Sequence, residues 1–113
     1  MIKIYHNPKC RKSRETLDII KASGKTPEII EYLKTPPSVE ELDDLLRKMD
    51  KMPEEIIRKG EDIYKLKFKN KDFSREEWLK VLVENPRLIE RPIVVNGNRV
   101  VLGRPPENVK EII

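Results

Sequence analysis

The amino-acid sequence predicts an α/β fold, a four-stranded mixed sheet with helices packed around it, in a single domain of residues 1–113. Three patterns predict this class. Residues 2–32 read as strand, helix and strand, an order that gives a right-handed parallel crossover. Two β-branched runs near the C-terminus flank an Asn-Gly pair, which is typical of an antiparallel hairpin. Between these parts, at about residues 34–88, apolar residues recur at helical spacing and predict a helical insertion.

The first half of the sheet is expected from two short apolar segments. Residues 2–5 form the first strand, which ends at His6-Asn7-Pro8, a sequence that favours a turn. A helical pattern begins at Lys9, and Gly24 suits the position just beyond a helix end. Residues 28–32 form the second strand, so the two strands should lie parallel on either side of the crossover.

The insertion contains helices with recognisable starts. Ser38 and Ser74 are each followed three residues later by Glu, the pattern of a capping box. Residues 53–60 predict a short helix that starts with Pro and carries Arg58 near its end. Residues 85–86, Asn-Pro, should close the last helix of the insertion.

The second half of the sheet is the predicted hairpin. Residues 92–95 and 99–102 are its strands, and Asn96-Gly97 predicts a type I′ turn between them. A final short helix is expected over residues 105–113. The complete order is that of a thioredoxin-like fold with a helical insertion at about residues 34–88.

Composition excludes several classes of protein. Charged residues make up 39% of the chain, but the net charge is only +4 and dispersed, so nucleic-acid binding is not indicated. The apolar runs are too short to cross a membrane, and a strand pattern begins at Met1, so we expect a cytoplasmic protein without a signal peptide. A single cysteine excludes an internal disulfide and a multi-cysteine metal site, and no metal is expected.

That cysteine, Cys10, is the main candidate for chemistry. It stands at or next to the first turn of a helix, where unpaired backbone N–H groups and the positive end of the helix dipole favour the thiolate. The thiolate is the nucleophilic form of cysteine. Lys9, Arg11, Lys12 and Arg14 add positive potential around it. The alternative is a buried and inert thiol, which so polar a stretch makes a poorer interpretation.

Two polar neighbours of Cys10 leave alternatives open. Ser13 gives a C-x-x-S spacing on the same helical face as Leu17 and Ile20, and serine cannot resolve a mixed disulfide. Any redox role therefore needs a second thiol from outside the chain, and Ser13 itself is either an ordinary helix residue or a site residue. His6 either packs the turn that places Cys10 or helps to set the charge of the thiol.

Three arginines outside this loop lie close to a glycine or a proline, residues that often mark the start or end of a helix or strand. Arg58 lies near Gly60, Arg91 precedes Pro92, and Arg104 precedes Pro105. Each alone is explained as a surface charge, and Arg58 at a helix end by its interaction with the helix dipole. Together with Cys10 they would form a cage of guanidinium groups for an oxyanion.

Several segments resemble the arsenate reductase family of the glutaredoxin-coupled type. The loop of residues 6–14, HNPKCRKSR, resembles that family's active-site loop, and residues 32–38 resemble the segment that leads into its helical insertion. Residues 57–59, 91–95 and 103–105 match its later signatures. The similarity covers nearly the whole chain.

The resemblance implies a thioredoxin-like fold and assigns roles by motif position. Cys10 matches the nucleophile, and Arg58, Arg91 and Arg104 match the arginines that bind the arsenic oxyanion. It also implies a cis peptide bond before Pro92.

The remaining loop residues have supporting roles under the same resemblance. His6 matches a histidine that influences the thiol, and Asn7 and Arg14 belong to the extended loop motif. The chain departs from the typical reductase at Arg11 and Lys12, where small residues are usual, so these cations could crowd the site.

The activity implied is an oxidoreductase that reduces arsenate to arsenite, with no bound cofactor and with glutathione and glutaredoxin as external reductants. One alternative is a glutathione-linked oxidoreductase acting on protein thiols or disulfides. Another is a regulator of the Spx type, which binds the RNA polymerase α subunit. Many such regulators carry a C-x-x-C switch, which Ser13 removes here.

Overall fold

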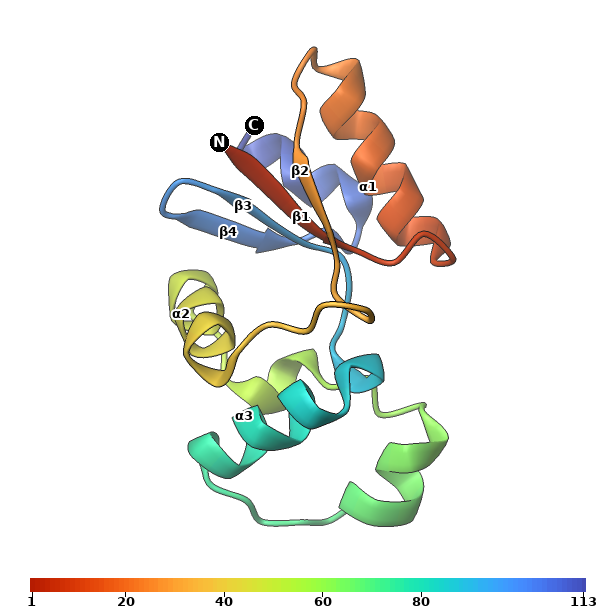
Figure 1. Ribbon diagram of the computed structural model, residues 1–113, viewed down its shortest axis with the longest axis vertical. Coiled ribbons are helices and arrows are strands. Elements are labelled where there is room, and N and C mark those ends of the chain that lie inside the picture. The colour runs from red at the N-terminus through yellow and green to blue at the C-terminus, as the bar shows by residue number, and fades with distance from the viewer. The chain divides into compact units, whose positions relative to one another are not determined.

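A computed structural model describes all 113 residues of the chain. Contacts divide it into two compact units, the first made of Met1–Thr35 with Arg91–Ile113 and the second of Pro36–Glu90. The first unit contains the sheet, the helix α1 and a C-terminal 3₁₀ helix, and the second unit is helical (Figure 1). None of the helices is long and apolar enough to span a membrane.

The sheet of the first unit has the strand order β2-β1-β3-β4. Its strands are β1 (Ile2–His6), β2 (Glu28–Glu31), β3 (Ile93–Asn96) and β4 (Arg99–Leu102). β1 pairs parallel with β2 and antiparallel with β3, and β3 pairs antiparallel with β4. The predicted four-stranded mixed sheet is therefore confirmed.

The core of the first unit lies between one face of the sheet and two helices. Alternate residues of β1, such as Ile4, point to this face together with Val94 of β3. The helix α1 (Arg11–Ala22) contributes Ile20, and the C-terminal 3₁₀ helix (Pro106–Glu111) contributes Val109. All four side chains have no exposed surface. Figure 1 shows α1 and this C-terminal helix, coloured blue, beside the sheet.

The two longer helices of the second unit begin as predicted. In α2 (Val39–Met49) the Ser38 hydroxyl accepts a hydrogen bond from the Glu41 backbone N–H at 3.1 Å. In α3 (Arg75–Glu84) Ser74 and Glu77 form the full capping box. Leu42, Leu46 and Leu82 are completely buried at the core of this unit, and Trp78 packs edge-on against Phe73 with ring centroids 4.9 Å apart. A short π-helix (Tyr64–Phe68) and a 3₁₀ turn (Pro86–Leu88) complete the unit.

Arg58 does not end a helix, which corrects the sequence prediction. The segment forms a single 3₁₀ turn, Pro53–Ile56, after which Ile57 pairs with Ile89 in an isolated antiparallel bridge. The Arg58 backbone N–H donates to the Leu88 carbonyl at 2.7 Å. Pairing with a distant segment has replaced the predicted helical turn, so no helix dipole explains Arg58.

The hairpin forms with a shifted turn. Asn96 pairs with Arg99, so the two turn residues are Gly97 and Asn98 rather than Asn96 and Gly97. Gly97 has φ of +63° and Asn98 is not among the residues of positive φ, a pattern that fits a type II′ turn rather than type I′. The final helix is also shorter than predicted, since its 3₁₀ turns start at Pro106 and end at Glu111.

Candidate active site

Four segments of the first unit meet at the same end of the sheet, the end at which β1, β2 and β4 finish and β3 begins. β1 and β2 run parallel, and their last residues, His6 and Glu31, are register partners. β3 runs the opposite way and begins at Ile93, opposite Tyr5, while β4 ends at Leu102, opposite Ile93. The Cys10 loop, Tyr32 and the segments before β3 and after β4 therefore all start from this end.

The loop after β1 places Cys10 at the start of α1. Cys10 is the N-cap residue, with extended backbone angles of φ −92° and ψ 123°. The Asn7 carbonyl accepts from the Cys10 backbone N–H at 3.0 Å, and the Asn7 side-chain oxygen accepts from the Lys9 N–H at 3.0 Å. The Arg14 guanidinium donates to the Pro8 carbonyl at 2.9 Å. Asn7 and Arg14 thus hold the loop.

Ser13 and His6 form a buried polar pair beneath this loop. The Ser13 hydroxyl oxygen lies 2.6 Å from His6 Nδ1 and accepts a hydrogen bond from the Asn7 backbone N–H at 3.1 Å. Ser13 has no exposed surface and His6 is 6% exposed. Burial lowers the pKa of His6, with Glu31 opposing the shift and Lys21 adding to it, so the neutral imidazole is favoured. Ser13 is therefore a structural partner of the loop rather than an ordinary helix residue.

The surroundings of the Cys10 thiol favour its thiolate form. Burial raises its pKa, but a hydrogen bond from the Arg91 side chain, hydrogen bonds from the Ser13 and Lys12 backbone N–H groups and the Arg91 charge together lower it below the ordinary value. The thiol is half-buried. Both sources of stabilisation, the free N–H groups at the start of a helix and a cation, are those that activate cysteines in general. A half-buried thiol with a lowered pKa argues against the alternative of a buried, inert cysteine.

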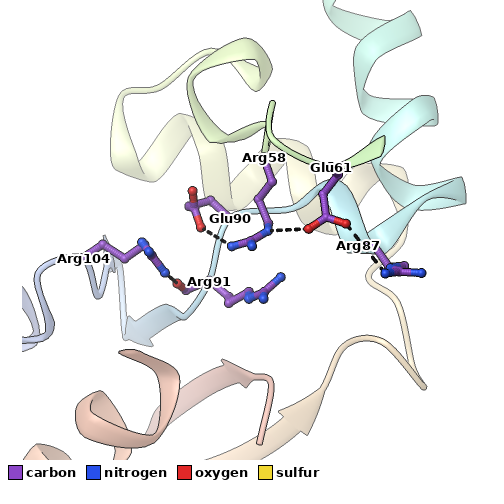
Figure 2. Close-up of polar contacts among 6 residues, drawn as sticks. All are labelled: Arg58, Glu61, Arg87, Glu90, Arg91 and Arg104. Atoms are coloured by element: carbon purple, nitrogen blue, oxygen red, sulfur yellow. Dashed lines mark hydrogen bonds and ion pairs between the residues drawn. The ribbon is translucent and has the colours of Figure 1, made fainter. Parts of the chain in front are cut away.

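Arg91 and Arg104 meet in this unit. Arg91 reaches Cys10 with its guanidinium and precedes Pro92 through a cis peptide bond, as the family resemblance implies. The Arg104 guanidinium donates to the Arg91 carbonyl at 3.2 Å (Figure 2). The peptide bond between Arg104 and Pro105 is also cis. Two of the three predicted arginines are therefore connected, and one of them contacts the sulfur.

Arg58 belongs to the second unit, where carboxylates pair with it. Its guanidinium donates to Glu90 at 3.1 Å and to Glu61 at 3.4 Å, and Glu61 also faces Arg87 at 3.8 Å (Figure 2). The side chains of Arg58, Glu61 and Glu90 are each about one quarter exposed. A role for Arg58 in oxyanion binding stays a prediction.

The two bulky cations after Cys10 point into solvent. Arg11 pairs with Glu15 one helical turn later, at 3.0 Å, and its side chain is 85% exposed. Lys12 is exposed as well. The contribution of this pair to the site is the backbone N–H of Lys12, which donates a hydrogen bond to Cys10.

Sequence reasoning missed two buried residues around the site. Tyr32 is 1% exposed and interacts with Arg91. Thr16 of α1 has no exposed surface and lies against Gly103, where an added Cβ would meet Thr16 Oγ1 at 2.7 Å and Pro92 Cγ at 2.8 Å. A usable signal existed for Thr16 and Ser13, since both are polar residues on or beside the apolar stripe of a helix.

Comparisons with known proteins match nearly the entire chain. The model of the ArsC family matches residues 5–112. An arsenate reductase of Haemophilus influenzae is 44% identical over 113 residues, which cover 97% of each chain. An uncharacterized protein of Escherichia coli, YfgD, is 46% identical over 99% of this chain and 96% of its own length. The solved structure of arsenate reductase from Vibrio cholerae has a TM-score of 0.94 at 44% identity and covers 99% of this chain and 97% of that chain.

Proposed function

This chain belongs to the ArsC family, and we propose that it is an arsenate reductase in which Cys10 is the nucleophile. The observation that carries the proposal is the contact between the Arg91 guanidinium and a thiol at the start of a helix, with a lowered pKa. This arrangement supports the proposal because it favours the nucleophilic thiolate and supplies positive charge next to it. Both are needed to attack an anion.

The charge of the substrate explains why the site needs such groups. Arsenate, like phosphate, is an anion near neutral pH, and a thiolate approaches it only where fixed positive groups offset the repulsion. The N–H groups of Lys12 and Ser13 and the Arg91 guanidinium stabilise the thiolate before substrate arrives. Arg91 and Arg104 then supply guanidinium donors to the arsenate oxygens, and Arg58 is proposed as a third.

The proposed first step is covalent. The Cys10 sulfur forms a bond to arsenic(V), an arsenic–oxygen bond breaks, and the hydroxide leaves as water after taking up a proton. A glutathione thiol then replaces a second hydroxide on arsenic. The glutaredoxin thiolate attacks the glutathione sulfur, and the electron pair of the broken sulfur–arsenic bond stays on arsenic, which becomes arsenic(III). Hydrolysis releases arsenite and the free Cys10 thiol.

The second and third thiols have to come from outside the chain, because Cys10 is its one cysteine. Glutathione and glutaredoxin are proposed as these reductants on the family resemblance. Both act in a reducing compartment, so we place the reaction in the cytoplasm. The proposed chemistry is carried by thiols and needs no bound cofactor.

The proposal is tested by arsenate-dependent thiol consumption with glutathione and glutaredoxin present. The wild type should turn over, and Cys10→Ser should abolish turnover. Arg91→Ala should lower kcat/KM by about 10- to 150-fold, the equivalent of a charged hydrogen bond of about 1.5–3 kcal/mol. Arg99→Ala, which removes an exposed arginine of β4, is the matched control and should change little.

The alternatives give other outcomes in the same assay. A wild type that ignores arsenate but reduces mixed disulfides between glutathione and proteins would point to a protein thiol oxidoreductase. Binding to the RNA polymerase α subunit that survives Cys10→Ser would point to a regulator. Either result, without arsenate turnover, would overturn the proposed function.

A further inference from the structure

Gly103 directly follows the last strand, β4, and lies against helix α1. A Cβ atom built on Gly103 would stand 2.7 Å from Thr16 Oγ1, 3.0 Å from Thr16 Cγ2 and 2.8 Å from Pro92 Cγ. Distances below 3.0 Å are too short for a Cβ contact, so a side chain here would have to displace Thr16 or Pro92. Gly103 is not among the glycines of positive φ. The glycine is therefore needed for space, not for its backbone conformation.

Thr16 presents a fixed surface to this glycine. The side chain has no exposed surface and stands on the buried face of α1. Its hydroxyl donates to the Lys12 carbonyl at 2.8 Å, one helical turn earlier, and its oxygen lies 3.4 Å from the Gly103 carbonyl. Threonine is branched at Cβ and therefore stiff about χ1, and this hydrogen bond restricts it further. Thr16 thus sets how closely Gly103 can approach the helix.

The two arginine-bearing segments are joined to each other beside this contact. The Gly103 N–H donates to the Pro92 carbonyl at 2.8 Å. The Arg104 guanidinium donates to the Arg91 carbonyl at 3.2 Å (Figure 2). These two bonds connect the segment before β3 to the segment after β4. Because Thr16 packs on Gly103 itself, the connected pair can approach α1 only as far as the Thr16 side chain allows.

The same helix begins at the proposed nucleophile. Cys10 is the N-cap residue of α1, and Thr16 lies six residues later. Over so short a length an α-helix has a fixed rise of about 1.5 Å per residue, so the two positions move together. A change in the distance between Gly103 and α1 is therefore carried to the distance between Cys10 and the two arginine-bearing segments.

We propose that Thr16 is a positioning residue: its contact with Gly103 sets how closely the two arginine-bearing segments approach the start of α1. Thr16 is completely enclosed, so it acts through these segments and not by touching the substrate. The inference deepens the proposed function, and its effect on arsenate turnover rests on that function. Its effect on the thiol does not, because Arg91 lowers the pKa of Cys10 without any substrate.

Gly103→Ala tests the contact by overfilling it. The added methyl group should push the arginine-bearing segments away from α1, so the pH midpoint of Cys10 alkylation by iodoacetamide should rise. In the arsenate assay kcat/KM should fall about 10- to 100-fold, up to the loss that a misplacement of about 1 Å can cause. Gly60→Ala, where an added Cβ meets no atom within 4 Å, is the matched control and should leave both readouts unchanged.

Thr16→Ala tests the contact from the other side. It removes both of the threonine atoms that face Gly103, so the segments are held less firmly and the alkylation midpoint should rise by less than in Gly103→Ala. In the double variant the new methyl group can occupy the space that Thr16 leaves, so the midpoint should return toward the wild-type value. Destabilisation alone does not do this. Ile20→Val, which removes a buried methyl group from the apolar core on the same helix, should leave the midpoint unchanged.

Thermal unfolding of each variant shows that the folded protein is being compared. The proposal is overturned if Gly103→Ala leaves the midpoint at the wild-type value, or if Thr16→Ala fails to bring it back in the double variant. Should Gly103→Ala not fold, Thr16→Ala alone decides, and an unchanged midpoint in that variant overturns the proposal.

The two proposals fail in different ways. A wild type without arsenate turnover refutes the proposed function, while the alkylation series still decides the role of Thr16. Normal wild-type turnover with an alkylation midpoint that neither Gly103→Ala nor Thr16→Ala moves refutes the role of Thr16 and leaves the proposed function standing.

Discussion

Replacing Ser13 with alanine tests how the active-site loop is held. The Ser13 hydroxyl serves two buried groups, His6 Nδ1 at 2.6 Å and the Asn7 backbone N–H at 3.1 Å. Asn7 is 7% exposed and His6 is 6% exposed, so water cannot readily replace the hydroxyl. When the Nδ1 atom of a neutral His6 carries no proton, the Ser13 hydroxyl donates a hydrogen bond to it, while the Ser13 oxygen accepts one from the Asn7 N–H, so both partners are satisfied.

The expected loss of stability follows from these two contacts. Each buried polar group left without a partner costs about 1–3 kcal/mol, and Ser13→Ala leaves two, so it should lower the free energy of unfolding by about 2–6 kcal/mol. A domain of this size is typically stable by about 5–15 kcal/mol, so a loss in the lower half of that range leaves the variant folded. Urea denaturation measures the change as a lower midpoint with an unchanged slope.

The matched control is Ser23→Ala at the other end of α1. Ser23 is exposed, and its hydroxyl donates to the Ile20 carbonyl at 2.6 Å. Water can replace that contact, so the loss should stay below about 0.5 kcal/mol. If Ser13→Ala unfolds at the same urea concentration as Ser23→Ala, the buried pair does not hold the loop and the reasoning is wrong.

Three further outcomes are expected. Burial depresses the pKa of His6 below 6.5, so the unfolded chain binds the proton first, and the free energy of unfolding should fall as the pH drops from 6.5 to the folded value. His6→Asn should lose this part of the slope in urea titrations at successive pH values. Gly103→Ala should destabilise by about 1–3 kcal/mol, because its Cβ would press on Thr16 and the rigid Pro92 ring, and an unchanged Tm would contradict the packing. Leu46→Ala should cost about 2–5 kcal/mol in the second unit, since Leu46 is completely buried, and a change below 1 kcal/mol by urea denaturation would count against that core.

The sheet could be predicted from the sequence because its signals are local. Two β-branched runs across a glycine-containing turn define a hairpin, and the strand–helix–strand order defines the parallel pair. The turn was misplaced by one residue because both Asn96-Gly97 and Gly97-Asn98 are good turn pairs. Pairing of Asn96 with Arg99 decides between them, and that register depends on the neighbouring strand β1.

The helix predicted at Arg58 is wrong because the conformation there is not set locally. It depends on a segment far along the chain. Pro53 and Gly60 mark the ends of a plausible helix, but Ile57 pairs with Ile89 and the Arg58 N–H with Leu88. These two contacts join residues about thirty positions apart in the sequence, and they outweigh the weak local preference of this segment for a helix. Local patterns contain no signal for such a bridge.

The sequence pointed to the candidate nucleophile and to the arginines proposed around it, but not to the buried residues that pack beneath the loop. Cys10 stands out as a cysteine at a helix start among cations, and the motif match pointed to Arg91 and Arg104. The sequence predicts Tyr32 as the last residue of a strand, whereas in the structure it directly follows β2 and is almost completely buried. Buried side chains that pack beneath a site can be identified only once the tertiary arrangement of the elements is known.

The three arginines of the motif do different work before any substrate binds. Arg91 interacts with the thiol directly, so its charge lowers the pKa of Cys10 in the free protein. Arg104 donates to the Arg91 carbonyl, which couples the segment after β4 to the segment before β3. Arg58 is paired with Glu61 and Glu90, so an anion that binds it has to compete with two carboxylates.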